Sequence, residues 1–243
     1  MEHECGLDVT HCDECDTELE VGQIGLCEDC TPEQTEFKFS GLSDAAKQKA
    51  REDFYSSDYP HNDWWDGVYE DANSIAKILG LDIESTRTLR GGGTALDIDI
   101  SFSGFWSQGD GASFKGSYRY NPKAVDEINA YCNDAELIRI ASELTTMQLA
   151  QRLLGYDFFT ARITITGNYS HSHSMDFEIH DWGTFADDSG VGEVNEDKFA
   201  QLMRNFANWI YKSLENEHDY LTSNEVVDEH LVDEIFDEGG NSL

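Results

Sequence analysis

Five of the six cysteines in this 243-residue chain lie within its first thirty residues. They include two Cys-x-x-Cys pairs, Cys12 with Cys15 and Cys27 with Cys30. Each pair can supply two thiolates to one tetrahedral zinc ion from a tight turn. Four thiolates close the coordination shell, which is typical of a structural site rather than a catalytic one. The spacing therefore predicts a zinc ribbon over residues 1–34 whose folding depends on structural Zn²⁺.

A glycine-rich stretch in the middle of the chain is a candidate recognition loop. Between residues 102 and 114 it reads Phe-Ser-Gly-Phe-Trp-Ser-Gln-Gly-Asp-Gly-Ala-Ser-Phe. Its glycines permit tight turns and close backbone approach, and the flanking residues predict a hairpin. It lacks the Lys-Ser/Thr ending of a phosphate-binding loop. We expect Phe105, Trp106, Gln108 and Asp110 to form a recognition tip, or the two aromatic residues to pack inward as a structural bracket.

Two further pairs of side chains could support catalysis. His171 and His173 alternate along an expected strand, so they would share one face and could bind a metal ion with a third ligand from elsewhere. Asp97 and Asp99 would share the polar face of another strand, as a cation site or an acid–base pair. In a chain this acidic, such carboxylate pairs also arise by chance. The alternative function is therefore a metal-assisted hydrolase or small-ligand-binding enzyme that uses the loop or the histidines.

Helices and strands mix along the chain after residue 34. Ser43 is a good N-cap for a helix from Asp44 to about Tyr55, and Gly80 should end a second helix that begins near Asp63. Strands are expected over residues 35–39, 96–102, 113–120, 159–167 and 172–180, and further helices over 122–131, 135–154, 193–218 and 223–236.

These elements predict an α+β fold with three parts. The first is the small N-terminal zinc ribbon over residues 1–34. The second is a mixed α/β core over residues 35–190 with a mainly antiparallel sheet. The third is a segment of acidic C-terminal helices over residues 191–243 that packs on the core.

The composition is strongly acidic, with 49 Asp and Glu against 16 Lys and Arg and a formal net charge of -33. So few cations argue against direct binding to nucleic acid or to an anionic membrane. Residues 1–31 contain ten carboxylates and no Lys or Arg, and residues 187–243 contain fifteen carboxylates against three cations. Blocks of like charge at chain ends are typical of interaction segments. A merely solvated surface, or a salt-rich host, would give the same balance.

The chain shows no targeting signal in its sequence. No stretch is long and apolar enough to span a membrane, and the first residues lack the basic and apolar regions of a signal peptide. We therefore expect a cytoplasmic protein whose cysteines are reduced or metal-bound.

The glycine-rich motif also carries a family resemblance. Together with the Trp64-Trp65 pair, Tyr69-Glu70-Asp71 and Leu79-Gly80-Leu81-Asp82-Ile83, it resembles a family of bacteriophage and prophage proteins labelled as antitoxins of toxin–antitoxin stability systems. The resemblance covers residues 36–120. It implies a phage or mobile-element origin and action in a bacterial cytoplasm, and it supplies no catalytic residues.

These features together predict a phage-encoded, non-enzymatic interaction protein. Its acidic surface would bind and inhibit or modulate a host protein with a basic groove, such as a toxin, a nuclease or a defence effector. Antitoxin-like, anti-defence and nucleic-acid-mimic inhibitors all fit this description. The oligomeric state is left open, and the expected contacts are with protein rather than with nucleic acid or membrane.

Overall fold

The computed structural model describes residues 14–15, 35–57, 59–60, 63–167, 169–181 and 191–243, with no side-chain description for 191–195. The chain divides into two compact units. Unit 1 takes in the chain up to Tyr59 together with Asn224–Leu243, and unit 2 comprises Pro60–Ser223. The acidic segment expected over residues 191–243 is thus shared between the units, its long helix lying in unit 2 and its end in unit 1.

Unit 1 is built from two helices and a short ribbon. Its elements are β1 (Phe37–Lys38), the 3-10 turn η1 (Phe39–Gly41), α1 (Asp44–Ser56), α6 (Asn224–Leu231) and β10 (Ile235–Phe236). The predicted N-cap is confirmed, because Ser43 Oγ accepts a hydrogen bond from the Ala46 backbone N–H at 3.2 Å. The last helix is shorter than expected, since Ile235 and Phe236 pair with β1 instead of continuing the helix.

The core of unit 1 contains residues from both of its chain segments, the one before Tyr59 and the one after Asn224. Its fully packed members are Phe39, Leu42, Ala46, Ala50, Val227, Leu231 and Phe236. Arg51 on α1 also forms a two-pronged ion pair with Asp228 on α6, with distances of 2.6 and 2.7 Å. Apolar packing and one ion pair therefore hold α6 against α1.

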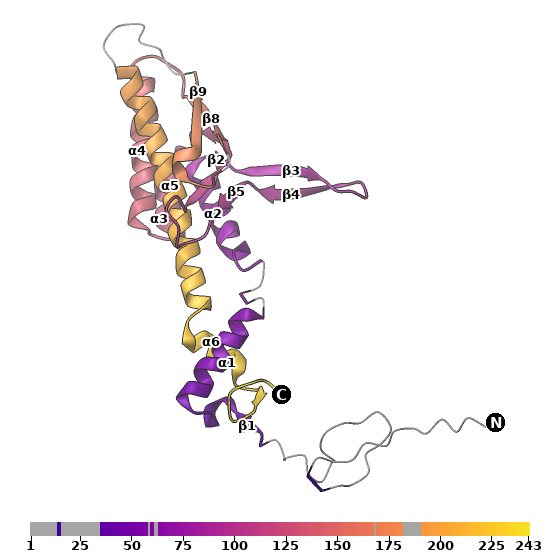
Figure 1. Ribbon diagram of the computed structural model, residues 1–243. Coiled ribbons are helices and arrows are strands. Elements are labelled where there is room, and N and C mark those ends of the chain that lie inside the picture. The colour runs from indigo at the N-terminus through magenta and orange to yellow at the C-terminus, as the bar shows by residue number, and fades with distance from the viewer. Residues whose placement is uncertain (1–13, 16–34, 58, 61–62, 168, 182–190) are drawn as a thin grey trace, which may run out of the picture. The chain divides into compact units, whose positions relative to one another are not determined.

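Unit 2 is a mixed α/β unit with antiparallel sheets (Figure 1). Its helices are α2 (Asp66–Leu79), α3 (Ala124–Tyr131), α4 (Ala135–Leu153) and α5 (Val191–Leu221), with the 3-10 turn η2 (Ser172–Ser174). Its strands are β2 (Leu81–Asp82), β3 (Glu84–Thr88), β4 (Thr94–Ile98), β5 (Ile100–Phe102), β6 (Ala112–Phe114), β7 (Gly116–Arg119), β8 (Thr160–Ile165) and β9 (Met175–His180). The largest sheet has the order β2-β7-β8-β9, and β3-β4 and β5-β6 form separate pairs.

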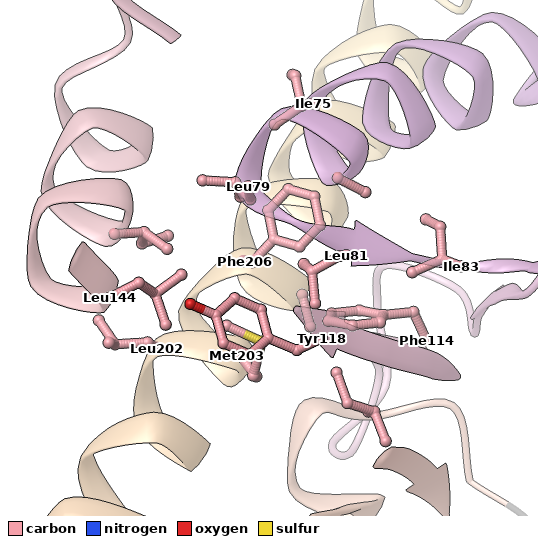
Figure 2. Packing of buried hydrophobic residues seen from close by; sticks show 14 of the residues in the cluster. Ile75, Leu79, Leu81, Ile83, Phe114, Tyr118, Leu144, Leu202, Met203 and Phe206 are labelled. Carbon is pink, nitrogen blue, oxygen red and sulfur yellow. The ribbon is translucent and has the colours of Figure 1, made fainter. Parts of the chain in front are cut away.

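The core of unit 2 lies where α2, α4 and α5 meet the sheet (Figure 2). Phe114 from β6 and Tyr118 from β7 are almost fully buried there, beside Phe206 from α5. Gly80 ends α2 with a φ of 86°, as predicted, and an added Cβ would lie 2.0 Å from the Arg119 carbonyl oxygen. The helix end and the sheet are therefore packed too closely for a side chain at this position.

The strand expected over residues 96–102 is divided at Asp99. The Asp99 N–H donates to the Ile83 carbonyl at 2.8 Å, whereas its carbonyl accepts from the Lys115 N–H at 3.0 Å. The chain thus changes partner, with β4 pairing with β3 and β5 with β6. The β3–β4 hairpin extends away from the rest of unit 2 (Figure 1). Leu96 on that hairpin is therefore 64% exposed.

The expected mixed α/β class with antiparallel sheets is confirmed for the described part of the chain. The expected zinc ribbon lies outside the described residues apart from Glu14 and Cys15. Every helix among the described residues is too short or too polar to cross a membrane.

Candidate functional site

The glycine-rich stretch forms the tip of the β5–β6 hairpin and is closed by its own hydrogen bonds. The Ser103 N–H donates to the Gly111 carbonyl at 3.1 Å, and the Gly111 N–H donates to Ser103 Oγ at 3.3 Å. Nearer the tip, Asp110 Oδ2 accepts from the Ser107 N–H at 2.6 Å. Gly109 has a φ of 102°, which favours glycine at this position. The tip is therefore a bracket with a fixed backbone.

The two aromatic residues of the loop point in different directions. Phe105 is half-buried in a cluster with Phe102, Tyr211 and His218, at ring-centroid distances of 5.9, 5.5 and 5.1 Å. Trp106 is 82% exposed and contacts His218 with its edge. Phe105 thus packs inward, as expected for a structural bracket, whereas Trp106 lies at the surface of the loop, and a recognition role for the tip stays a prediction.

The histidine pair lies on a turn rather than on the expected strand. Residues 172–174 form a 3-10 turn, in which Ser174 Oγ donates to the carbonyls of Tyr169 and His171. The expectation that His171 and His173 share a strand face is therefore wrong. Their rings are instead stacked, with centroids 5.2 Å apart and planes inclined by 17°. The His173 N–H donates to His171 Nδ1 at 3.0 Å, which leaves the proton of the neutral His171 ring on Nε2.

The glycine-rich loop and the histidine turn meet, although about sixty residues separate them. Ser103 Oγ donates to the Ser170 carbonyl at 3.3 Å. A Cβ added to Gly111 would lie 2.9 Å from the His171 ring, so a glycine is needed at this contact. Between the two segments lies a cavity of about 760 Å³. It is lined by Ser103, Ser107, Gln108, Gly109, Asp110, Tyr169, Ser170, His171, His173 and Ser174.

The cavity therefore brings together two candidate groups that the sequence treated separately. Gln108 and Asp110 of the loop line it, and so do His171 and His173. Sequence reasoning missed Tyr169 and the four serines, which carry no motif of their own. Gly111 was the available signal, since a glycine at a hairpin end often marks a close approach by another segment.

The electrostatic field at the loop is negative. Asp110 is the sole Asp, Glu, Lys or Arg among the described residues that line the cavity. Next to the loop, the Tyr211 hydroxyl donates to the Gly104 carbonyl at 3.1 Å. Burial raises the pKa of Tyr211, and the carboxylates of Glu215 and Asp110 raise it further. The negative field favours binding of a cation over an anion in this cavity.

The geometry does not favour the metal-assisted alternative. Among the described residues, no group of three or more His, Cys, Asp or Glu side chains is arranged to hold a metal ion. Asp97 is engaged elsewhere, because Arg87 on the facing strand donates to it at 2.6 Å. The expected zinc ligands Cys12, Cys27 and Cys30 lie outside the described residues, and Cys15 is exposed.

Most carboxylates of the described residues have no cationic partner. Seven of them form ion pairs with Lys or Arg, namely Asp53, Glu84, Asp97, Glu136, Glu143, Asp157 and Asp228. Unpaired carboxylates are concentrated at residues 224–243, which contain seven carboxylates and no Lys or Arg. Five of these seven are exposed and without an ion pair in the described structure, and we term them the C-terminal acidic patch: Glu225, Glu229, Asp233, Glu234 and Glu238.

Two carboxylates of the patch share one face of α6. Glu225 and Glu229 are four residues apart, on the face opposite the buried Val227 and Leu231. Like charges at this spacing destabilise a helix by about 0.2–0.5 kcal/mol. Repulsion between the two carboxylates therefore opposes the helix, although Glu225 by itself is favoured in the first turn by the helix dipole.

Similarity to a known protein family extends over residues 64–224 of the chain. No curated protein and no solved structure matches it. A family model does match, over residues 64–224, and its description is a domain of unknown function, DUF8835. The matched range contains α2 through α5, and with them the hairpin tip, the histidine turn and the cavity between them. Because the match covers more than half of the sequence, this chain belongs to the DUF8835 family.

Proposed function

We propose that this protein is a non-enzymatic binding protein whose acidic surface docks on a basic groove of another protein and so inhibits or modulates it. A toxin, a nuclease or another defence effector of a bacterial host has the required chemistry, and a phage or prophage origin fits this role. The proposal extends to an antitoxin-like or nucleic-acid-mimic action, in which carboxylates occupy a groove that otherwise holds phosphates.

The observation that carries this proposal is the surplus of exposed carboxylates without ion pairs. Most Lys and Arg side chains with a carboxylate neighbour lie in unit 2, where they join helices and strands of the fold. No carboxylate of the C-terminal acidic patch forms an ion pair with Lys or Arg among the described residues, although Lys38 donates to the backbone carbonyl of Asp233 at 2.9 Å. Repulsion within the patch would be relieved if a basic partner neutralised its charge.

The test begins by finding the partner. The full chain is immobilised and exposed to a lysate of the cells that encode it, and proteins released by salt are identified by mass spectrometry. The retained protein is then purified and titrated at two ionic strengths, with circular dichroism confirming the fold at each. We expect a basic protein whose Kd weakens about tenfold or more at the higher salt. An affinity independent of salt would contradict the proposal.

A matched pair of variants locates the surface. The patch variant carries E225Q, E229Q, D233N, E234Q and E238Q. The control variant removes the same charge from exposed carboxylates without ion pairs in unit 2, through D63N, E70Q, D176N, D181N and D219N. We expect the patch variant to lose about tenfold or more in association rate and the control variant to lose much less. Equal losses would mean that net charge, and not the patch, drives binding.

The zinc ribbon over residues 1–34 is a separate part of the proposal. We propose that Cys12, Cys15, Cys27 and Cys30 hold structural Zn²⁺ and that the ribbon adds to the acidic surface. Metal analysis of the full chain should find zinc in equal amount to protein. Removing it with a chelator should abolish the protease resistance of residues 1–34 and leave units 1 and 2 folded. A chain that binds no zinc would contradict this part alone.

A further inference from the structure

The cavity between the glycine-rich loop and the histidine turn offers one free carboxylate oxygen. Asp110 Oδ2 is occupied by the Ser107 N–H at 2.6 Å, whereas Oδ1 has no hydrogen-bond partner among the described residues. No Lys or Arg of the described residues lines the cavity to neutralise this charge. The oxygen is thus held in position by the turn and is available to a donor from outside.

The same cavity offers flat aromatic surfaces. His171 and His173 are stacked, and His171 Nδ1 accepts a hydrogen bond from the His173 N–H. Tyr169 also lines the cavity and is 77% exposed. The face of a tyrosine ring such as that of Tyr169 attracts cations, and the planar guanidinium of arginine stacks on it better than the ammonium of lysine.

The cavity wall also contains a hydrogen-bonding group without a partner. The Gln108 side chain makes no hydrogen bond within the described residues, so its amide oxygen can accept one. Gln108 and Asp110, which both line the cavity, therefore each have an acceptor oxygen without a partner among the described residues. A guanidinium presents five N–H donors in a rigid fork and can use several acceptors at once.

We propose that this cavity binds the guanidinium group of an arginine side chain of the basic partner protein. The Asp110 carboxylate and the Gln108 amide oxygen accept its N–H groups, and the aromatic rings of the histidine turn receive its flat face. This inference rests on the proposed function, since it names the chemical group by which a basic partner is recognised. It predicts discrimination between arginine and lysine, which a diffuse acidic surface does not provide.

The test uses N-acetyl-L-arginine amide and N-acetyl-L-lysine amide as probes on the full chain. Each is titrated while amide and imidazole resonances are followed by NMR, at an ionic strength where the fold is intact. We expect saturable shifts in the two loop segments with the arginine probe, at a Kd on the order of millimolar. The Kd of the lysine probe should be at least about fivefold higher than that of the arginine probe.

Asp110→Asn is the informative variant. Its amide oxygen can still accept from the Ser107 N–H, so the turn is retained while the charge is removed. We expect the arginine Kd to rise about tenfold in this variant. Asp176→Asn, which removes an exposed charge outside the cavity, should leave the arginine Kd unchanged. Absence of saturable arginine binding, equal binding of lysine, or an unchanged Kd in Asp110→Asn would each overturn the inference.

The outcomes for this cavity and for the proposed function are distinguishable. If a basic partner binds through the C-terminal acidic patch while arginine binding fails these tests, the cavity inference alone is wrong. If the arginine probe binds through Asp110 while no basic protein is retained, the cavity inference stands and the proposed function is wrong.

Discussion

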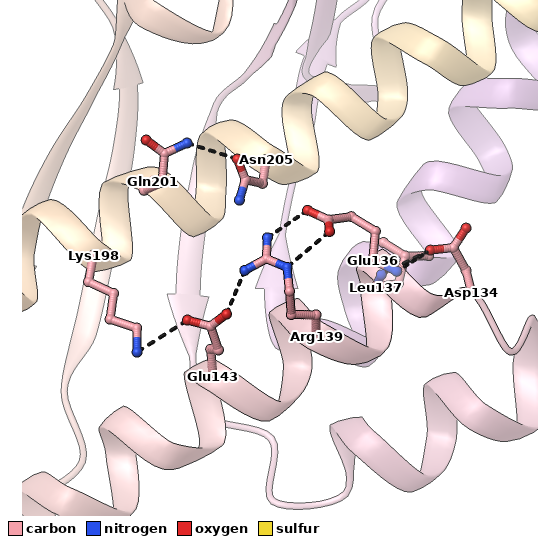
Figure 3. Close-up of polar contacts among 8 residues, drawn as sticks. All are labelled: Asp134, Glu136, Leu137, Arg139, Glu143, Lys198, Gln201 and Asn205. Carbon is pink, nitrogen blue, oxygen red and sulfur yellow. Dashed lines mark hydrogen bonds and ion pairs between the residues drawn. The ribbon is translucent and has the colours of Figure 1, made fainter.

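On α4, Glu136 and Glu143 lie on either side of Arg139, whereas Glu225 and Glu229 on α6 lie one turn apart with no cation between them. Arg139 donates to Glu136 at 2.6 Å and also binds Glu143, and Lys198 of α5 approaches Glu143 at 3.1 Å (Figure 3). Two carboxylates and two cations thus alternate from α4 to α5. On α6 the same kind of side chain faces solvent with like charge as its neighbour.

This difference separates carboxylates that serve the fold from carboxylates that do not. The hydrogen bond from Arg139 lowers the pKa of Glu136. Burial alone would raise the pKa of Glu143, but hydrogen bonds from Lys198 and Arg139 outweigh it and lower the pKa. Charge in this network joins two helices of the unit 2 core. Asp228 of α6 likewise pairs with Arg51 of α1, whereas Glu225 and Glu229 form no ion pair in the described structure, and we propose that these two serve binding.

Asp110 shares features of both groups, because it accepts a hydrogen bond within its own turn and has no ion pair in the described structure. Substitution in its loop should have the largest effect on stability. In Gly111→Ala the new methyl group would lie 2.9 Å from the His171 ring and force the two loop segments apart. We expect a loss of about 1–3 kcal/mol in the free energy of unfolding, measured by denaturant titration. Gly104→Ala in the same loop is the control, because its nearest neighbour would be Asp110 Oδ2 at 3.5 Å. Equal losses in both variants would mean that the effect comes from alanine in the loop and not from the contact of Gly111 with His171.

Removing the cation from the α4 network should have the next largest effect. In Arg139→Met, Glu136 and Glu143 lose a shared partner, and we expect the free energy of unfolding to fall by about 1 kcal/mol. The estimate is modest because the Arg139 side chain is 41% exposed and its ion pairs are screened by solvent. Lys115→Met removes an exposed cation without an ion pair in the described structure and should change stability much less.

The same network predicts how stability depends on pH. Because the pKa values of Glu136 and Glu143 are lowered in the folded protein, their contribution is present above the ordinary value of 4.5. It is lost as the pH falls below about 4.5 and both groups become protonated. The stability difference between the natural protein and Arg139→Met should therefore be greatest near neutral pH and shrink below pH 4.5. A difference that stays constant to low pH would show that Arg139 acts through packing alone.

The smallest effects should differ in sign between the two helices. Glu143→Gln should lower the free energy of unfolding by about 0.5 kcal/mol, because a favourable ion pair is lost. Glu229→Gln should raise it by about 0.3 kcal/mol, because repulsion from Glu225 is relieved. Thermal melts of both variants at one ionic strength provide the comparison. A loss of stability in Glu229→Gln would show that α6 needs its charge for folding.

Local signals predicted the start of α1 and the end of α2. Ser43 and Gly80 act at helix ends through contacts within a few residues, so their roles can be read from neighbouring residues. The division of the strand at Asp99 could not be predicted in this way, because it depends on Ile83 and Lys115, which come from two other segments.

The candidate site was predictable only as separate pieces. The glycine-rich loop was evident from its composition, and its expected hairpin is confirmed. The histidine turn was predicted as part of a strand from the alternation of its residues. That pattern does not reveal the hydrogen bonds that Ser174 donates to the carbonyls of Tyr169 and His171. The meeting of the two segments depends on the packing of unit 2 as a whole, and no local pattern encodes it.

The central claim is that the C-terminal acidic patch serves binding and not folding. The most direct test measures the free energy of unfolding and the affinity for the purified basic partner on one preparation of the patch variant. We predict that the variant is as stable as the natural protein or slightly more stable, because repulsion on α6 is removed. Its affinity should fall about tenfold or more. A variant that loses stability while keeping its affinity would contradict the account.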